Sequence, residues 1–334
     1  MSRGIHTSTQ WRCWSLLATR THATRRSIHT IPSQRQPDIE SLRHKAFLAE
    51  KPLHLRCDGD MLPATSQWFT PIALESTAPR TLTTHFTEQS HHKLDFPFEV
   101  YVPQIGSNHS TKAFQRWLLS HGADGFDQHR LGLMMQAVVP DNPDSCFYQL
   151  HAPISLLQHA LEFNSSVQKD PVQLYIAQCA ISELPGPLQQ DVQAPELVLK
   201  VGKGDIYASS IWIGTEPTYT PMHRDPNPNL FYQLCGRKNV RLLPPGAGDL
   251  VFVQAQRKLG RQGSSRIRGS QMMEEPERTL LYNTVWEDEE VAGEMYEGTL
   301  DEGDGLFIPK GWWHSVRSVG KQGGLNGSVN WWFR

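Results

Sequence analysis

Long hydrophobic runs and closely spaced cysteines are both missing from this sequence of 334 residues. No stretch of 18 or more consecutive apolar residues occurs, so we expect no membrane-spanning helix. The five cysteines are far apart in the chain, and none forms a Cys-x-x-Cys pair. This spacing disfavours a disulfide framework and a zinc knuckle, and it is typical of reduced thiols in an intracellular protein.

Negative charge is absent from the first part of the chain. Residues 1–37 contain six arginines and no Asp, Glu or Lys. This composition, rich also in Ser and Thr, predicts a mitochondrial transit peptide, with a disordered tail as the alternative. We therefore expect this segment to lie outside the fold and the protein to be mitochondrial, with the cytoplasm or nucleus as alternative locations.

The rest of the chain is mildly acidic. The net charge is −2, and subtracting the +6 of residues 1–37 leaves about −8 for the remainder. Because non-specific binding to nucleic acid depends on a basic surface, we expect no stable nucleic-acid partner.

Residues 38–195 mix helical and strand patterns. Asp38 is a suitable N-cap for a helix that follows it, and residues 111–120 also show a helical spacing of apolar side chains. The clearest strand covers residues 94–103, where Pro97 would confine it to the edge of a sheet. We expect this part of the chain to form an α/β cap that packs on the core.

Residues 196–334 are dominated by short strand-like segments. The expected strands cover residues 206–213, 230–235, 240–243, 250–253, 305–309 and 328–333. Many short strands with Gly and Pro turns are typical of a barrel or sandwich, of which the jelly roll is one form. Residues 254–270, with five basic side chains among Gly and Ser, predict a solvated loop. The fold class is therefore mainly β with flanking helices.

A candidate metal site centres on His223 and Asp225. In an extended segment, positions i and i+2 project to the same side, so both side chains can reach one ion. His314 is the only histidine that follows His223, so it alone can supply a second imidazole from the C-terminal strands. Two imidazoles and one carboxylate on one face of an ion leave the opposite positions open, which suits non-haem Fe(II) oxygenases.

Each candidate also has a simpler interpretation when it is taken alone. His314 follows two tryptophans and is compatible with an ordinary half-buried histidine. Lys238 is compatible with a solvated charge at the start of a strand, and Asn229 with a turn residue after a proline. The local pattern therefore leaves both interpretations open for each residue.

Several ordered motifs resemble the JmjC family, a cupin-like group of Fe(II)- and 2-oxoglutarate-dependent oxygenases, and in particular its small hydroxylases. In chain order, the matching segments cover residues 175–178, 212–214, 220–225, 229–230, 233–238, 307–314 and 328–332. The resemblance implies a double-stranded β-helix, the jelly-roll core of the cupins, within residues 196–334.

The resemblance also implies a metal and a cosubstrate. His223, Asp225 and His314 would ligate Fe(II) and would thus be the catalytic residues. Lys238 would form a salt bridge with the distal carboxylate of 2-oxoglutarate, for which a lysine is a charge-assisted partner. O₂ would be the second cosubstrate.

Five further residues are implied to surround 2-oxoglutarate. Tyr175 and Thr220 would hydrogen-bond its distal end, since hydroxyl groups fix the orientation of a ligand in an otherwise apolar pocket. Asn229 would lie near the keto-acid end. Trp212 and Asn330 would line the pocket.

The implied activity is hydroxylation of a C–H bond, on a protein side chain by preference, with release of succinate and CO₂. The alternatives are a JmjC-type demethylase, an oxygenase of a small molecule or RNA, and a cupin-like protein that binds a partner without turnover. No zinc-finger or other chromatin-reading pattern is present, which disfavours a histone demethylase. No further helices follow the last predicted strand, which favours a monomer.

Overall fold

Two β-sheets form the centre of the computed structural model, which describes residues 27–57, 62–70, 80–90, 94–102, 109–120, 126–139, 147–167, 170–260, 273, 276–288 and 293–334. The five-stranded sheet has the order β1 (Ser27–Thr30), β11 (Glu294–Leu300), β10 (Lys238–Leu243), β13 (Trp313–Ser318) and β8 (Tyr219–Arg224). The nine-stranded sheet has the order β2 (Ser33–Arg35), β3 (Leu53–Arg56), β12 (Gly305–Ile308), β9 (Asn229–Cys235), β14 (Leu325–Phe333), β7 (Ile206–Thr215), β6 (Leu174–Ala180), β4 (Asp95–Tyr101) and β5 (Phe147–Pro153).

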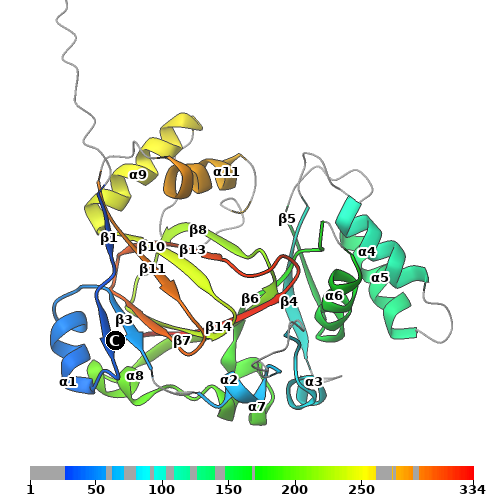
Figure 1. Cartoon of the computed structure of the whole chain (residues 1–334), viewed down its shortest axis with the longest axis horizontal. Coiled ribbons are helices and arrows are strands. Elements are labelled where there is room, and N and C mark those ends of the chain that lie inside the picture. The colour runs from blue at the N-terminus through cyan, green and yellow to red at the C-terminus, as the bar shows by residue number, and fades with distance from the viewer. Residues whose placement is uncertain are drawn as a thin grey trace, which may run out of the picture.

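From β7 to β14 the chain passes back and forth between the two sheets in the manner of a jelly roll, except that β10 and β11 are consecutive strands of the same sheet. β7, β9, β12 and β14 belong to the nine-stranded sheet, and β8, β10, β11 and β13 belong to the five-stranded sheet. The sheets curve around a shared interior (Figure 1). This arrangement confirms the predicted double-stranded β-helix core with flanking helices.

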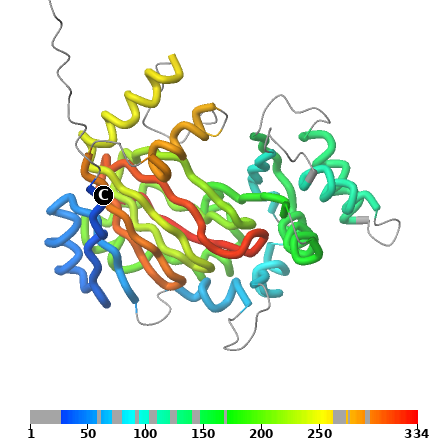
Figure 2. Tube along the Cα trace, turned by 45° about the horizontal axis from the view of Figure 1, so that its top comes forward, coloured from blue at the N-terminus to red at the C-terminus, as the bar shows by residue number. Residues whose placement is uncertain are grey.

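Residues before 196 extend the core sheet as well as covering it. β6 pairs with β7 and β4 pairs with β6, so the sheet continues past the barrel into β4 and β5. Helices α4 (His109–Ser120), α5 (Phe126–Val138) and α6 (Ser155–Ser166) lie beside β4 and β5 at one end of the molecule (Figure 2). Phe98 of β4, Phe114 of α4 and Phe163 of α6 belong to one buried cluster, which holds these elements together.

Shorter helices complete the cap. They are α1 (Ile39–Leu42) with the π-helical turn η1 (Arg43–Phe47), α2 (Ala64–Gln67), α3 (Thr84–Ser90), the 3₁₀ turn η3 (Ile181–Glu183), α7 (Gly186–Asp191) and α8 (Glu196–Val201). The carboxylate of Asp38 accepts a 2.7 Å hydrogen bond from the backbone N–H of Ser41, which confirms the predicted N-cap. No helix in the described part of the chain is both long and apolar enough to cross a membrane.

The prediction that residues 1–37 lie outside the fold was wrong for their last part. β1 pairs in parallel with β11, and β2 pairs in parallel with β3. Ile31, between the two strands, is 2% exposed. Both strands are polar and become strands only through hydrogen bonds to β11 and β3, so their own composition does not predict them. The predicted targeting signal falls mainly on residues 1–26, which lie outside the described part of the chain.

The prediction that Pro97 confines its strand to a sheet edge was also wrong. β4 lies between β6 and β5. Its pairing with β5 covers the whole strand, but its pairing with β6 is confined to residues 98–100. Pro97 therefore lies where only one neighbour is paired, and a residue without a backbone N–H is tolerated there.

An insertion between β10 and β11 covers the outer face of the five-stranded sheet (Figure 1). It contains α9 (Pro245–Lys258), α11 (Glu277–Tyr282) and the π-helical turn η4 (Asn283–Glu287). The predicted strand at residues 250–253 and the start of the predicted loop at residue 254 were wrong, because both belong to α9. Val251 and Ala255, four residues apart, both pack in a cluster with Trp313, so burial of one helical face favours a helix over a strand here. Residues 261–270 lie outside the described part of the chain.

Candidate active site

His223, Asp225 and His314 meet between the two sheets. His223 lies on β8 directly opposite His314 on β13, and Asp225 follows β8 immediately. One ligand atom from each residue lies within 4.8 Å of those of the other two. The three side chains are 10%, 12% and 5% exposed, so a carboxylate and two imidazoles share a site with little water.

A β-bulge turns Thr220 toward the same interior as His223. Thr220 pairs with Val316 and His223 pairs with His314, so three steps along β8 match two steps along β13. In a regular strand, residues three apart face opposite sides of the sheet. The extra residue of the bulge reverses this alternation and brings both side chains into one pocket.

Backbone carbonyls orient both imidazoles. Nδ1 of His223 lies 2.9 Å from the carbonyl oxygen of Pro221, and Nδ1 of His314 lies 3.3 Å from that of Trp312. Because a carbonyl can only accept, each Nδ1 carries a hydrogen, and Nε2 is the nitrogen that can offer a lone pair to an ion. The two Nε2 atoms lie 3.9 Å and 3.6 Å from the carboxylate of Asp225, as metal ligands of one ion would.

The carboxylate of Asp225 is held in its charged form. Its Oδ2 accepts hydrogen bonds from Nε1 of Trp332 at 2.7 Å and from Nδ2 of Asn229 at 3.1 Å. Burial by itself raises the pKa of Asp225, but His314, His223 and these two donors outweigh it and leave the pKa below its ordinary value. A carboxylate that stays ionised is suited to bind a cation.

The predicted residues Asn229, Asn330 and Trp212 form a hydrogen-bonded chain that ends at Asp225. Trp212 Nε1 donates to Oδ1 of Asn330 at 2.7 Å, and Asn330 Nδ2 donates to Oδ1 of Asn229 at 3.2 Å. Asn229 then donates to Asp225. The amides of Asn229 and Asn330 are nearly fully buried, so this series of hydrogen bonds fixes the orientation of each amide and of the carboxylate.

Lys238 is a buried cation at the other end of the pocket, and it is 2% exposed. Its Nζ donates to Ser328 Oγ at 2.9 Å and lies 3.5 Å from the hydroxyl of Tyr175. No carboxylate of the described residues lies within salt-bridge distance of it. Burial lowers the pKa of Lys238 to about 7, against the opposing charge of Glu216.

Tyr175 occupies its position because Gly214 lies beside it on β7. A Cβ atom at Gly214 would lie 2.4 Å from the carbonyl oxygen of Leu174 and 2.7 Å from the ring of Tyr175. Only glycine permits this approach between β6 and β7. The glycine of the Trp-Ile-Gly motif therefore positions the tyrosine predicted to contact the cosubstrate.

The structure brings all nine predicted site residues to a single pocket with about 420 Å³ of empty space, part of which is open to solvent. Four lining residues were not predicted: Phe231, Ile308, Val316 and Trp332. Ser328, which binds Lys238, was also missed. Each of these except Ile308 lies two positions from a predicted residue on the same strand, so the two-residue period of a strand contains the signal for them.

Comparison with known proteins identifies relatives. A family profile described as a cupin-like domain matches residues 45–334. The chain is 29% identical over 156 residues to lysine-specific demethylase JMJ30 of Arabidopsis thaliana, covering 47% of this chain and 33% of that protein. It is 31% identical over 149 residues to Jumonji C domain-containing protein 5 of Drosophila melanogaster, covering 43% and 33%. It is 26% identical over 160 residues to lysine-specific demethylase 8 of Danio rerio, covering 48% and 36%.

The matched segments span about a third of the length of these curated relatives. The family profile, in contrast, covers most of this chain and includes the whole double-stranded β-helix. Enzymes of the JmjC family generally use Fe(II) and 2-oxoglutarate. The chain therefore belongs to the cupin-like domain family, among its JmjC-domain members.

Proposed function

We propose that this chain is an Fe(II)- and 2-oxoglutarate-dependent dioxygenase that hydroxylates a C–H bond of a protein side chain. The observation that carries the proposal is the presence, in one pocket, of a His-Asp-His cluster and a buried lysine with no carboxylate partner among the described residues. Each group alone has a structural explanation, but together they provide for a metal and for an anionic cosubstrate.

The donor set fits Fe(II). His223 and His314 present Nε2 lone pairs and Asp225 presents an ionised carboxylate, so three ligands occupy one side of an ion and leave the other side for exchangeable ligands. The hydrogen bonds from Trp332 and Asn229 hold the carboxylate in place before metal arrives. A purely structural cluster has no need of oriented imidazoles.

The opposite end of the pocket fits a dicarboxylate. A buried ammonium group is costly unless an anion compensates it, and the charge of Lys238 is aimed into the pocket beside the hydroxyl of Tyr175. We assign to Lys238 a salt bridge with the distal carboxylate of 2-oxoglutarate. Tyr175 and Thr220 would donate hydrogen bonds from their hydroxyls to the same carboxylate. Ser328 orients the lysine.

The remaining residues of the pocket exclude water and competing reactions. Phe231, Ile308 and Val316 supply apolar parts of the pocket wall. When bound, Fe(II) with 2-oxoglutarate and O₂ supplies the oxidation of C–H to C–OH, with release of succinate and CO₂. The contribution of the chain is to hold the cosubstrate in one orientation and to keep the site dry.

Succinate production tests this function. Purified protein with Fe(II), ascorbate and 2-oxoglutarate should form succinate without added substrate, and His223→Ala or Asp225→Ala should abolish it. Lys238→Ala should weaken the affinity for 2-oxoglutarate more than the affinity for metal. Wild-type protein that neither binds 2-oxoglutarate nor forms succinate with any candidate substrate would contradict the proposal.

Demethylation is the second candidate, and the names of two relatives favour it. It uses the same oxidation, because hydroxylation of an N-methyl group gives a product that loses formaldehyde. Mass spectrometry of candidate proteins distinguishes the two outcomes. A gain of one oxygen atom supports stable hydroxylation, whereas loss of a methyl group with release of formaldehyde supports demethylation.

A further inference from the structure

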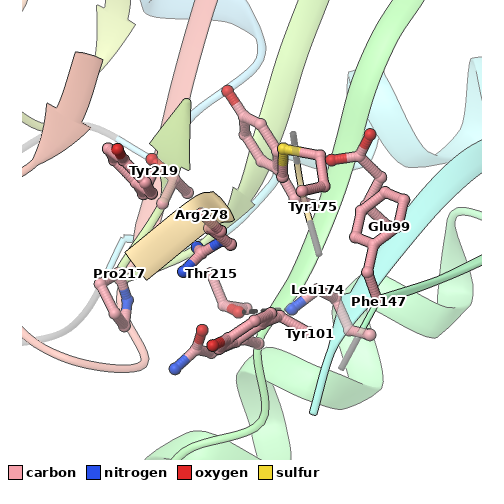
Figure 3. Close-up of a pocket in the computed structure, with 12 residues that line it drawn as sticks. Glu99, Tyr101, Phe147, Leu174, Tyr175, Thr215, Pro217, Tyr219 and Arg278 are labelled. Carbon is pink, nitrogen blue, oxygen red and sulfur yellow. Dashed lines mark hydrogen bonds between the residues drawn. The ribbon is translucent and has the colours of Figure 1, made fainter. Parts of the chain in front are cut away.

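A second pocket lies on the other side of Tyr175, with about 350 Å³ of empty space, part of which is open to solvent (Figure 3). Tyr175 lines both pockets, so its side chain is a shared wall. The new pocket lies where the β4–β5 extension of the sheet meets the insertion between β10 and β11, since both regions contribute lining residues. None of the roles assigned above uses this space.

One face of the nine-stranded sheet carries both pockets. Glu99 pairs directly with Tyr175 across β4 and β6, and Tyr101 pairs with Phe147 across β4 and β5. Directly paired residues share a face, as do residues two apart on one strand, so these four side chains all project to the same side. That side is the one on which Trp212 lines the first pocket.

Arg278 of α11 contributes a cation to the second pocket. Its Cζ lies 4.1 Å from the ring centre of Tyr101 and 4.9 Å from that of Tyr219. The guanidinium group is therefore in contact with two aromatic rings. Its Nε–H is buried and has no acceptor among the described residues. A buried donor without an acceptor is costly, and a carboxylate is the planar acceptor that best matches a guanidinium group.

The second charged residue that lines the pocket is Glu99, and it is separated from Arg278 by Tyr175. Glu99 is 8% exposed, and Figure 3 shows it on the opposite side of Tyr175 from Arg278. Arg278 is the only basic residue that lines the described part of this pocket. An anionic group would therefore be directed to Arg278 and away from Glu99. Phe147, Leu174 and Met273 supply apolar walls for the body of such a ligand.

We propose that this second pocket binds a carboxylate group, with Arg278 as its cationic partner. Two sources share this chemistry: an acidic side chain of the protein substrate, and a free small carboxylate. Only the first source depends on the function proposed above. Tyr219, whose ring contacts Arg278, and His223 both belong to β8, so this strand connects the second pocket to the first.

Benzoate is a suitable probe, because it combines a carboxylate with a flat apolar body. The full chain, loaded with Mn(II) and saturated with 2-oxoglutarate under anaerobic conditions to fill the first pocket, should bind benzoate in calorimetry or ligand-observed NMR. Arg278→Gln should weaken this binding by about tenfold or more. Arg257→Gln removes an exposed cation of the same insertion and should leave the affinity unchanged.

Arg278→Lys provides a second comparison if Arg278→Gln does not fold. It keeps the charge but loses the planar donors, so its affinity for benzoate should lie between those of the wild type and Arg278→Gln. Absence of benzoate binding to the wild type, or equal affinity in wild type and every folded Arg278 variant, would overturn the proposal.

Peptide binding separates the two sources. Pools of degenerate heptapeptides with one fixed Glu should bind the loaded wild type more tightly than pools with one fixed Gln, and Arg278→Gln should remove the difference. Benzoate binding without a preference for Glu would support a free carboxylate as the ligand. A preference for Glu that persists unchanged in Arg278→Gln would overturn the substrate arm.

Failure of this inference is distinguishable from failure of the proposed function. Uncoupled succinate formation reports only on the first pocket and should be retained in Arg278→Gln. If wild-type protein forms succinate but benzoate binding does not depend on Arg278, the second pocket has been misassigned. If benzoate binds through Arg278 but no succinate forms, the oxygenase proposal fails and the carboxylate site remains.

Discussion

The indole N–H of Trp332 donates a 2.7 Å hydrogen bond to Oδ2 of Asp225 and so links the last strand to a residue 107 positions earlier in the chain. Asn229 donates to the same oxygen. The carboxylate is therefore oriented from the side away from β8, and its position depends on two elements that contribute no metal ligand.

Trp332→Phe should weaken metal binding. The substitution keeps most of the ring but removes the donor, and loss of such a hydrogen bond to a metal ligand costs about 10- to 100-fold in metal affinity. Anaerobic calorimetry with Fe(II) or Mn(II) measures the change. Trp117→Phe, the same substitution on α4 outside the pocket, should leave the affinity unchanged. Equal affinities in all three proteins would show that Trp332 has no part in orienting Asp225.

The affinity for 2-oxoglutarate should fall as the pH rises above about 7. Burial lowers the pKa of Lys238 to about 7 in the ligand-free protein, so above this pH the lysine must take up a proton before it can pair with the carboxylate. The dissociation constant should then increase about tenfold per pH unit. Calorimetry with 2-oxoglutarate at saturating Mn(II) between pH 7 and 9 tests this. A flat profile would place the pKa well above 9.

Lys238→Met should stabilise the ligand-free protein while abolishing 2-oxoglutarate binding. The folded-state pKa of about 7 lies below the ordinary value of 10.5, so below pH 7 the wild type carries the full cost of burying a charge. Between these values the unfolded state binds more protons, and the stability of the wild type rises with pH. Removing the charge should gain on the order of a few kcal/mol at pH 7.

Chemical denaturation from pH 7 to 10 measures this effect. The stability of Lys238→Met should lack the rise with pH that the wild type shows. Lys321→Met, which removes an exposed lysine, should follow the wild-type profile. A loss of stability in Lys238→Met at pH 7 would mean that contacts with Ser328 and Tyr175 outweigh the cost of burial.

Gly248→Ala should destabilise the protein and loosen the metal site. A Cβ atom at Gly248 on α9 would lie 2.1 Å from a ring atom of Trp313, which is fully buried next to His314. Either the helix or the tryptophan must move, at a cost of about 1–3 kcal/mol. Gly246→Ala, in the first turn of the same helix, meets nothing within 4 Å and should be neutral or slightly stabilising.

Thermal unfolding and metal affinity should be measured for both alanine variants. A drop in melting temperature in Gly248→Ala with weaker metal binding would link the insertion to the site through Trp313. If the two variants unfold at the same temperature, the contact between α9 and β13 is more compliant than its geometry indicates.

Local spacing was sufficient to bring His223 and Asp225 together as candidate metal ligands. The separation of His223 and Asp225 by one residue places both on one side of an extended segment, whatever the rest of the chain does. The same reasoning extended by two residues would have found Phe231 from Asn229 and Trp332 from Asn330. Their roles were missed because apolar residues at these positions are equally compatible with an ordinary core.

Elements whose hydrogen bonds or packing depend on distant segments were the ones missed. β1 and β2 are polar, and only their partners β11 and β3 make them strands. Residues 250–253 have the β-branched composition of a strand, but their contacts with Trp313 favour the helix.

The sequence by itself determined that His223 and Asp225 project to one side of an extended segment and that the second half of the chain is rich in short strands, because residue type and short-range period settle both. The jelly roll was implied only by the resemblance to the JmjC family. Only the tertiary structure decided which neighbours surround each side chain and therefore its charge environment and orientation. Ser328 lies 90 residues from Lys238, and Tyr175 lies 63 residues from it, yet together they form the environment of its charge. The bulge that turns Thr220 inward and the two rings that contact Arg278 likewise arise from contacts between distant segments, which no local pattern specifies.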